Sequence, residues 1–437
     1  MERREFIKRA GYTLPFSESV YEILFGGYEN PQTSVKRDTA PGTAIWEHGT
    51  EREIRASPTV SEGVVYIGTY QSIFDGAVQA DDTPSPFYAL DAETGEEIWR
   101  FGTDEGVGST ATVDGELVYF GTNDGTVRCL GKEDGDERWS FNVSGGIRSS
   151  PVVSDNTLYI GSVEFGTEGS HSFATNVDEE GDTEFRREAY GSVYGIHAGT
   201  GEVKWSFDSD GAVISSPILK DSVLYFTSEE DAHAVDAETG EEVWSFEHSQ
   251  PSTSTPTVAG GRMYLGETSW EDSTVYAIDT ETGEEVWSAD RPRSVRGSPT
   301  VYDGTLYHGC EDGAVYAVDT ETGETVWRGV VGGLDELTTE NIGMDGGKRI
   351  RSSVTVAENR LYVGSYDGSL YALDTEDGEE VWGFETGGNV HSSPVLIDGT
   401  VYFGSFDGSV YGVETDVDAS GQGSRAELGA VGYIRRS

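Results

Sequence analysis

The sequence is poor in cysteine and in long apolar runs. Its two cysteines, Cys129 and Cys310, are too few for a disulfide framework. No run reaches the ~18 apolar residues that a membrane-spanning helix needs. The seven histidines show no mutual spacing that suggests metal ligation, and no Ser-His-Asp order, zinc-site spacing or phosphate-binding loop stands out. These absences exclude a disulfide-stabilised mini-domain and a helical membrane protein, and they leave the common catalytic motifs without support.

Positive charge is also scarce. The chain has 79 Asp and Glu residues against 29 Lys and Arg, a net charge of −50, and only 6 of its basic residues are lysine. A field of this sign repels phosphate, so we expect neither nucleic acid nor an anionic membrane surface as a partner. The composition resembles that of haloarchaeal proteins, for which molar salt shortens the range of self-repulsion to about 3 Å.

What the sequence has in abundance is repetition. The segment DTETGEEVW at 279–287 recurs as DAETGEEIW at 91–99, DAETGEEVW at 236–244, DTETGETVW at 319–327 and DTEDGEEVW at 374–382. Two more divergent copies lie at 131–139 and 197–205. Such recurrence indicates a repeat architecture, in which each unit packs on its neighbours in the same way.

Each repeat unit is expected to contain four short strands. SSPVVSDNTLYIGS at 149–162 predicts two strands joined by a tight turn at Asp155–Asn156, and GSLYALDTEDGEEVW at 368–382 predicts two more, joined at 376–378. An antiparallel meander of four strands in roughly 40 residues is typical of a propeller blade. We therefore expect an all-β fold, a single β-propeller, which is also consistent with a monomer.

Eight units are present. Their first strands begin near Ser57, Thr110, Ser150, Ser216, Thr255, Ser298, Ser353 and Ser393. The closing Trp of the outer strand, which we expect to pack on the neighbouring blade, is found at Trp99, Trp139, Trp205, Trp244, Trp287, Trp327 and Trp382, with Trp46 serving the eighth unit. We predict a ring of eight blades closed by the amino-terminal strand around Trp46, which removes exposed sheet edges. The predicted divisions are a leader at 1–42, the propeller at 43–414 and a tail at 415–437.

The repeat pattern AxDxxTGxxxW, preceded by SxPxV, YxG and GxVYA, resembles the PQQ-like or tryptophan-docking repeat of the quinoprotein propellers. The WD40 repeat is the nearest alternative, but Trp99 is followed by Arg100 and not by Asp. The enzymatic branch of this family oxidises alcohols or sugars with pyrroloquinoline quinone (PQQ) and calcium, and its alcohol-oxidising members have two adjacent cysteines beside the quinone. Cys129 and Cys310 fall in blades 2 and 6, too far apart for a disulfide.

The non-enzymatic branch of the family fits the length of this chain better. It includes an eight-bladed scaffold lipoprotein of outer-membrane assembly, which works by binding other proteins. This resemblance implies a non-catalytic binding or scaffold role with a protein partner, and we assign no cofactor. A small anionic ligand is the other partner that we expect, on the basis of the arginine residues before the first strands. The alternative is an oxidoreductase that depends on PQQ and calcium.

Two patterns predict the binding face. Extra residues at 69–87, 162–190 and 329–350 fall in loops between second and third strands or in blade-to-blade links, which share one face of a propeller. Three residues before the Pro position of the first strands stand Arg55, Arg148, Arg296, Arg351 and His391, with Gly108, Ile214 and Thr253 in the other units. We expect these side chains near the mouth of the central channel, where guanidinium groups suit carboxylates or phosphates. The alternative is that each Arg pairs with a carboxylate of a neighbouring blade.

The two ends of the chain leave further alternatives open. DVDASGQGSRAE at 416–427 matches the calcium-loop template through Asp416, Asp418, Ser420 and Glu427, although it equally reads as a polar tail. ERREFIKRAG at 2–11 resembles a twin-arginine export signal, but a poor apolar stretch follows it. A signal implies an extracellular or cell-surface protein, and a simple charged leader implies a cytoplasmic one.

Overall fold

The computed structural model describes residues 40–50, 52–70, 84–165, 175–177, 183–185, 189–269, 272–332 and 348–421. The amino-terminal segment with its twin-arginine motif and Glu427 of the predicted calcium loop lie outside the described residues, as does most of the three predicted insertions. Within the described part, no helix is long and apolar enough to cross a membrane.

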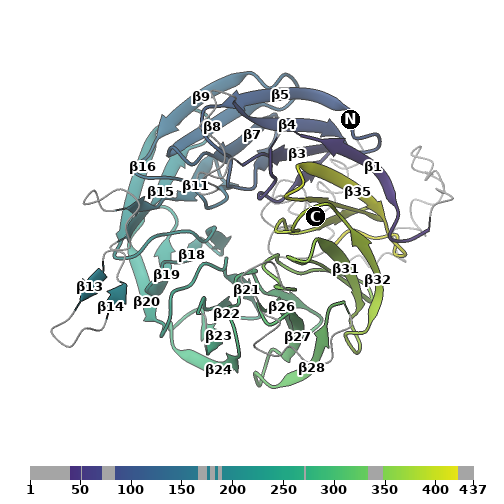
Figure 1. Cartoon of the computed structure of the whole chain (residues 1–437). Helices are drawn as coiled ribbons and strands as arrows, with labels where there is room; N and C mark the ends of the chain where they lie inside the picture. Colours follow the sequence, from purple (N-terminus) through teal and green to yellow (C-terminus); the bar gives the residue numbers. More distant parts are fainter. Residues whose placement is uncertain are drawn as a thin grey trace, which may run out of the picture. The chain divides into compact units, whose positions relative to one another are not determined.

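The described residues form eight antiparallel blades arranged in a ring (Figure 1). In blades 1 and 2 the strands are β2 (Thr59–Ser61), β3 (Val64–Gly68), β4 (Ser85–Asp91), β5 (Glu97–Thr103), β6 (Thr112–Asp114), β7 (Leu117–Gly121), β8 (Thr126–Gly131) and β9 (Glu137–Asn142). Blades 3 and 4 comprise β10 (Val152–Ser154), β11 (Thr157–Gly161), β15 (Ala189–His197), β16 (Val203–Ser209), β17 (Ile218–Lys220), β18 (Val223–Thr227), β19 (Asp231–Asp236) and β20 (Glu242–Glu247). The prediction of an eight-bladed all-β propeller is confirmed.

The second half of the ring repeats the same order. Blades 5 and 6 comprise β21 (Thr257–Ala259), β22 (Arg262–Gly266), β23 (Ser273–Asp279), β24 (Glu285–Arg291), β25 (Thr300–Tyr302), β26 (Thr305–Gly309), β27 (Ala314–Asp319) and β28 (Thr325–Val330). Blade 7 contains β29 (Thr355–Ala357), β30 (Arg360–Gly364), β31 (Ser369–Asp374) and β32 (Glu380–Glu385), and blade 8 contains β33 (Val395–Ile397), β34 (Thr400–Gly404), β35 (Ser409–Glu414) and β1 (Ala44–Gly49). Blade 3 carries an additional strand, β12 (Glu164–Phe165), on β15, and β13 (Thr175–Val177) pairs with β14 (Thr183–Phe185).

The amino-terminal strand closes the ring. β1 pairs antiparallel with β35, from Ala44 opposite Val413 to Gly49 opposite Ser409. Blade 8 is therefore built from both ends of the propeller sequence. This pairing confirms the predicted closure, and it supplies partners for β35 that an open array would leave exposed.

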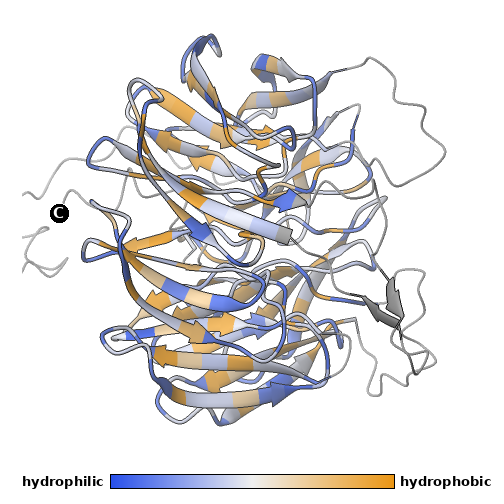
Figure 2. Cartoon of the chain, turned by 90° about the vertical axis from the view of Figure 1, so that its left-hand side faces the viewer, coloured by the Kyte–Doolittle hydropathy of each residue, from blue (hydrophilic) through white to orange (hydrophobic). Residues whose placement is uncertain are grey.

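The hydrophobic core lies between adjacent blades. Tyr66 and Phe87 of blade 1 share one buried cluster with Val118 and Phe120 of blade 2, and the rings of Phe87 and Phe120 stack at 4.2 Å. Equivalent clusters follow at the other blade junctions. Figure 2 shows the hydrophobic residues concentrated in the strands and the hydrophilic ones in the loops. Because neighbouring blades cover both faces of each sheet, the second and third strands are buried on both sides, whereas the outer, fourth strands keep many exposed residues.

The repeated TG step and the closing Trp are parts of one contact. Gly95 has a positive φ of 72°, which L residues adopt at a cost, and a Cβ at this position would lie 2.6 Å from Cε3 of Trp46 in the preceding blade. The indole N–H of Trp46 donates a hydrogen bond to the carbonyl oxygen of Ala92 at 2.9 Å. The remaining acceptors, in order from Trp99 to Trp327, are Lys132, Ala198, Ala237, Thr280, Thr320 and Thr375. Glycine is required here both by its φ and by the indole that covers it.

Buried hydroxyl groups link the first strands at six of the eight blade junctions. The backbone N–H of Ser393 in blade 8 donates to Oγ of Ser57 in blade 1 at 2.9 Å. The same contact joins Thr110 to Ser150, Ser150 to Ser216, Ser216 to Thr255, Ser298 to Ser353 and Ser353 to Ser393. At these six junctions, the Ser or Thr at the start of the first-strand motif thereby satisfies a buried amide of the preceding blade, a role that the sequence pattern alone did not reveal.

Candidate functional site: the inner rim

The first strands of neighbouring blades contact one another around the propeller axis, so the segments that lead into them form an inner rim. One set of rim residues is the predicted one, Arg55, Arg148, Arg296, Arg351 and His391. A second set lies two residues beyond the second strands and includes Tyr70, Glu311, Tyr366 and Phe406. Backbone N–H groups of the second set donate, at 2.8–2.9 Å, to carbonyl oxygens two residues before members of the first set: Tyr70 to Glu53, Glu311 to Ser294, Tyr366 to Arg349 and Phe406 to Asn389.

Two rim arginines share one buried carboxylate. Nε of Arg296 donates to Oε1 of Glu311 at 2.9 Å, and Nε of Arg351 donates to the same oxygen at 2.5 Å. The Glu311 side chain is only 4% exposed, whereas those of Arg296 and Arg351 are 27% and 20% exposed. Burial lowers the pKa of Arg296, and the neighbouring Glu311 carboxylate opposes this effect. The ordinary pKa of arginine is so high that the Arg296 and Arg351 guanidinium groups stay charged at neutral pH. The three side chains together carry one net positive charge.

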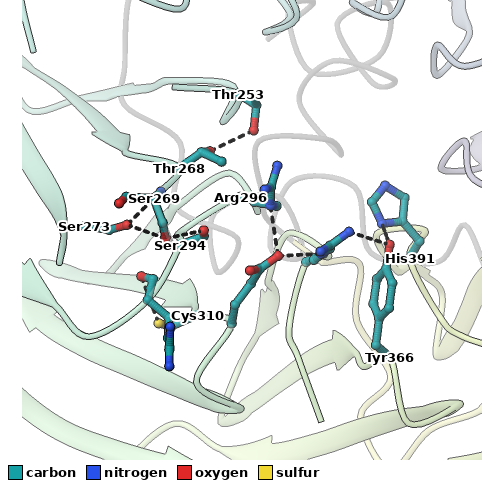
Figure 3. Close-up of polar contacts among 12 residues, drawn as sticks. Thr253, Thr268, Ser269, Ser273, Ser294, Arg296, Cys310, Tyr366 and His391 are labelled. Carbon is teal, nitrogen blue, oxygen red and sulfur yellow. Dashed lines mark hydrogen bonds and ion pairs between the residues drawn. The ribbon is translucent and has the colours of Figure 1, made fainter. Parts of the chain in front are cut away.

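Aromatic groups continue this cluster into blades 7 and 8. Arg351 lies over the ring of Tyr366 at 4.6 Å and donates from Nη1 to the Tyr366 hydroxyl at 3.2 Å. The same hydroxyl is 3.0 Å from Nδ1 of His391, whose ring lies 6.0 Å from that of Phe406. Figure 3 shows the polar contacts that connect Arg296, Tyr366 and His391.

The cluster extends across the closing junction to blade 1. Arg55 lies over the ring of Phe406 at 5.0 Å and over that of Tyr70 at 4.1 Å. Its Nη2 also pairs with Glu53 at 3.3 Å, in a partly exposed contact. We call the continuous set from blade 6 to blade 1 the cation–aromatic arc; it consists of Arg296, Glu311, Arg351, Tyr366, His391, Phe406, Arg55 and Tyr70.

The remaining rim positions differ in character. Arg148 of blade 3 is exposed and makes no hydrogen bond or ion pair with the described residues. Gly108 and Ile214 carry no polar side chain, and the hydroxyl of Thr253 contacts that of Thr268 at 3.0 Å. Of the predicted set, Arg351 pairs with a carboxylate of the neighbouring blade, whereas Arg296 and Arg55 pair with carboxylates of their own blade or link. Anion binding by these side chains stays a prediction.

Sequence reasoning missed the second set of rim residues. Glu311, Tyr366 and Phe406 occupy equivalent places in GCEDG, GSYDG and GSFDG, where the strand ends in Gly and a DG turn follows. Aligning the repeats at that Gly would have placed them beside the predicted arginines. The signal for these residues is thus their common position after the Gly that ends each second strand.

Part of the predicted calcium loop has structural partners. Oδ2 of Asp416 pairs with Nε of Arg360 at 2.7 Å, and its Oδ1 accepts from the indole of Trp382 at 3.3 Å. Asp416 thus takes the place that a backbone carbonyl holds at the other Trp contacts. Oγ of Ser420 accepts from the N–H of Asp398 at 3.3 Å, and Asp418 is exposed. Because Glu427 lies outside the described residues, calcium binding here stays a prediction.

The residues described do not fit a quinone-and-calcium site of the alcohol-oxidising kind. Cys129 and Cys310 are buried free thiols in blades 2 and 6, which agrees with the prediction that they do not pair. Among the residues that the structure describes, no group of three or more His, Cys, Asp or Glu side chains is placed to hold a metal ion. We therefore assign no catalytic step to PQQ or calcium.

Comparison with known proteins places the chain in one family. No curated protein sequence matches it. Among solved structures, BamB from Moraxella catarrhalis has a TM-score of 0.63 at 16% identity, covering 85% of this chain and 99% of that one. The computationally designed protein Ika8 has a TM-score of 0.63 at 18% identity over 86% of this chain and all of that one. A quinohemoprotein alcohol dehydrogenase from Comamonas testosteroni has a TM-score of 0.62 at 15% identity over 86% of this chain and 77% of that one.

These structural similarities establish the fold alone, because all of the identities are low. The family model described as outer membrane protein assembly factor BamB matches residues 87–179, 189–343 and 328–420, which is most of the propeller. The chain belongs to the PQQ-like propeller family that this model represents.

Proposed function

We propose that this propeller is a non-catalytic binding or scaffold protein that contacts a protein partner or an anionic ligand through its insertion-bearing face. The family model is named after an assembly factor, and that description supports a binding role. The observation that carries the proposal is the cation–aromatic arc, in which two guanidinium groups share one carboxylate and keep a net positive charge. A local positive site of this kind attracts carboxylates or phosphates in a chain whose net charge is −50.

The second candidate function is a quinoprotein-type oxidoreductase. The fold is shared with the alcohol dehydrogenase of Comamonas testosteroni, so the scaffold itself is compatible with either role. The described residues argue against this candidate, since they offer neither adjacent cysteines nor a metal-binding cluster. We therefore rank it second.

Thermal unfolding separates the two candidates. The purified protein is melted in about 1 M salt with and without PQQ and calcium. A ligand at a hundredfold excess over its dissociation constant stabilises the folded state by about 2.7 kcal/mol, which raises the melting temperature measurably. We expect no rise. A rise that is saturable in PQQ would replace the binding role with the oxidoreductase.

Site-specific photo-crosslinking tests the face itself. A photoreactive amino acid replaces Thr253 on the inner rim in one variant and Glu376, in an exposed turn between third and fourth strands, in the other. Both variants are incubated with extract of the source organism. Adducts that form only from position 253 support the proposal, whereas adducts only from position 376 would move the binding surface to the opposite face.

A further inference from the structure

The basic side chains of the first rim set are divided unequally between the two halves of the inner rim. Blades 6, 7, 8 and 1 contribute Arg296, Arg351, His391 and Arg55, which lie in one connected set of contacts. The equivalent positions of blades 2 to 5 contribute Gly108, Arg148, Ile214 and Thr253, of which only Arg148 is charged. The rim is therefore an arc with one cationic side and not a symmetrical ring.

Basic residues cluster in the segments shortly before the first strands of blades 6 and 7, although the link to blade 7 also carries Asp335, Glu336, Glu340 and Asp345 further upstream. Residues 291–296 and 348–351 include Arg291, Arg293, Arg296, Lys348, Arg349 and Arg351 and no acidic residue, although acids outnumber bases in the whole chain by 79 to 29. Arg291 is only 4% exposed and packs inside the blade junction, so it does not belong to the surface. Arg296 and Arg351 do reach the surface.

The two rim guanidinium groups retain hydrogen-bond donors. Glu311 engages only Nε of each arginine, and the Tyr366 hydroxyl engages Nη1 of Arg351. Both terminal nitrogens of Arg296 and Nη2 of Arg351 are therefore unpaired among the residues that the structure describes. Because Glu311 already orients both groups, a ligand need not immobilise flexible side chains, which lowers the entropic cost of binding.

We infer that the cation–aromatic arc binds an extended acidic segment of a partner protein, with its carboxylates on Arg296 and Arg351 and its backbone along the partly exposed rings of Tyr366 and Phe406. This inference rests on the proposed binding role of the same face. Planar guanidinium groups bind carboxylates through paired N–H donors. The aromatic rings between the arginines of blades 7 and 1 offer apolar surface, which a chain of residues contacts along its length and a single compact anion does not.

The net charge favours a short acidic segment over nucleic acid. Duplex DNA carries one negative charge per ~1.7 Å along a rigid, wide helix, so it would bring phosphates into direct contact with acidic residues beside the arc. A peptide presents a few carboxylates only, and at about 1 M salt its interaction with residues more than about 3 Å away is screened. Direct contacts with the arc then outweigh the distant charges.

Fluorescence anisotropy of the full-length protein tests this inference. The probe is a fluorescein-labelled peptide of about ten alternating Asp and Glu residues, compared with a peptide of Asn and Gln in the same order, in about 1 M salt. We expect saturable binding of the acidic peptide and none of the amide peptide. In Arg296→Gln/Glu311→Gln/Arg351→Gln, which leaves no buried carboxylate unpaired, we expect the dissociation constant to rise about tenfold or more.

Arg148→Gln is the matched control, because it removes a charge from an equivalent rim position outside the arc. Its dissociation constant should stay within about twofold of the unmodified protein. No binding of the acidic peptide, equal binding of the amide peptide, or an equal loss in Arg148→Gln would each overturn the inference. Competition by citrate as strong as by unlabelled peptide would also overturn it, in favour of a small-anion site. If photo-crosslinking from position 253 succeeds while the peptide does not bind, the proposed function stands and only this inference fails.

Discussion

Replacing Gly95 with alanine tests the physical basis of the tryptophan contact at the junction that closes the ring. Gly95 has a φ of 72°, and the new Cβ would lie 2.6 Å from Cε3 and 2.7 Å from Cδ2 of Trp46. An L residue in the left-handed region costs about 1–2 kcal/mol. Displacing a packed indole adds about 1–3 kcal/mol, as other overpacking substitutions do. We therefore expect Gly95→Ala to lower the free energy of unfolding by roughly 2–5 kcal/mol.

Gly63→Ala is the matched control for the backbone term. Gly63 has a φ of 79°, but a Cβ there would have no atom within 4 Å. This variant should lose only the conformational part, about 1–2 kcal/mol. The difference between the two variants therefore isolates the contact with the indole.

Urea unfolding at constant high salt, followed by tryptophan fluorescence, measures both variants. The free energy is compared at unchanged dependence on urea, so that a shift in midpoint reports stability. If the two substitutions cost the same, the indole does not constrain Gly95, and the account of the repeated TG step given above is wrong.

Four further predictions concern the buried groups and the net charge. Ser57→Ala should lower the free energy of unfolding by about 1–3 kcal/mol, because the buried N–H of Ser393 loses its acceptor. The control Ser140→Ala, on an exposed outer strand, should change it by less than about 0.5 kcal/mol, and the urea midpoints of both variants test this. Burial raises the pKa of Cys129 to about 12 and also raises that of Cys310. A disulfide reagent at pH 8 should therefore react with neither thiol in the folded protein and with both in urea. Rapid reaction of the folded protein would contradict the burial of these thiols. Burial lowers the pKa of His233, His248 and His308 below the ordinary value of 6.5, so these side chains bind protons on unfolding when the pH is below 6.5. The free energy of unfolding should therefore fall as the pH decreases through this range. His233→Leu should make this pH dependence less steep, and an unchanged slope would exclude His233 as a contributor. The melting temperature should rise as potassium chloride is increased from about 0.1 M to 1 M, because the salt screens the self-repulsion of 79 acidic residues, and a flat dependence would show that this repulsion is unimportant.

The predictable part of the site is its position, and the unpredictable part is its pairing. The alignment of the repeats was sufficient to place Arg296 and Arg351 at equivalent positions before the first strands of two blades, because the link into each blade follows the same course. That both meet the single carboxylate of Glu311 depends on how neighbouring links converge at the axis. The position of a residue within the repeat locates its backbone in the blade, but it does not determine the conformation of a long side chain.

The sequence by itself determined the number of blades, the ring closure by Trp46 and the four-stranded blade. Local patterning suffices for these features, because tight turns and alternating strands recur in every unit and one unit lacks its last strand. Only the tertiary structure decided that Trp46 covers Gly95, that Ser57 accepts from Ser393, and that Asp416 replaces a carbonyl at Trp382. Each of these contacts joins residues from different blades. Their geometry is set by the packing of one sheet on the next, which no pattern within a single repeat specifies.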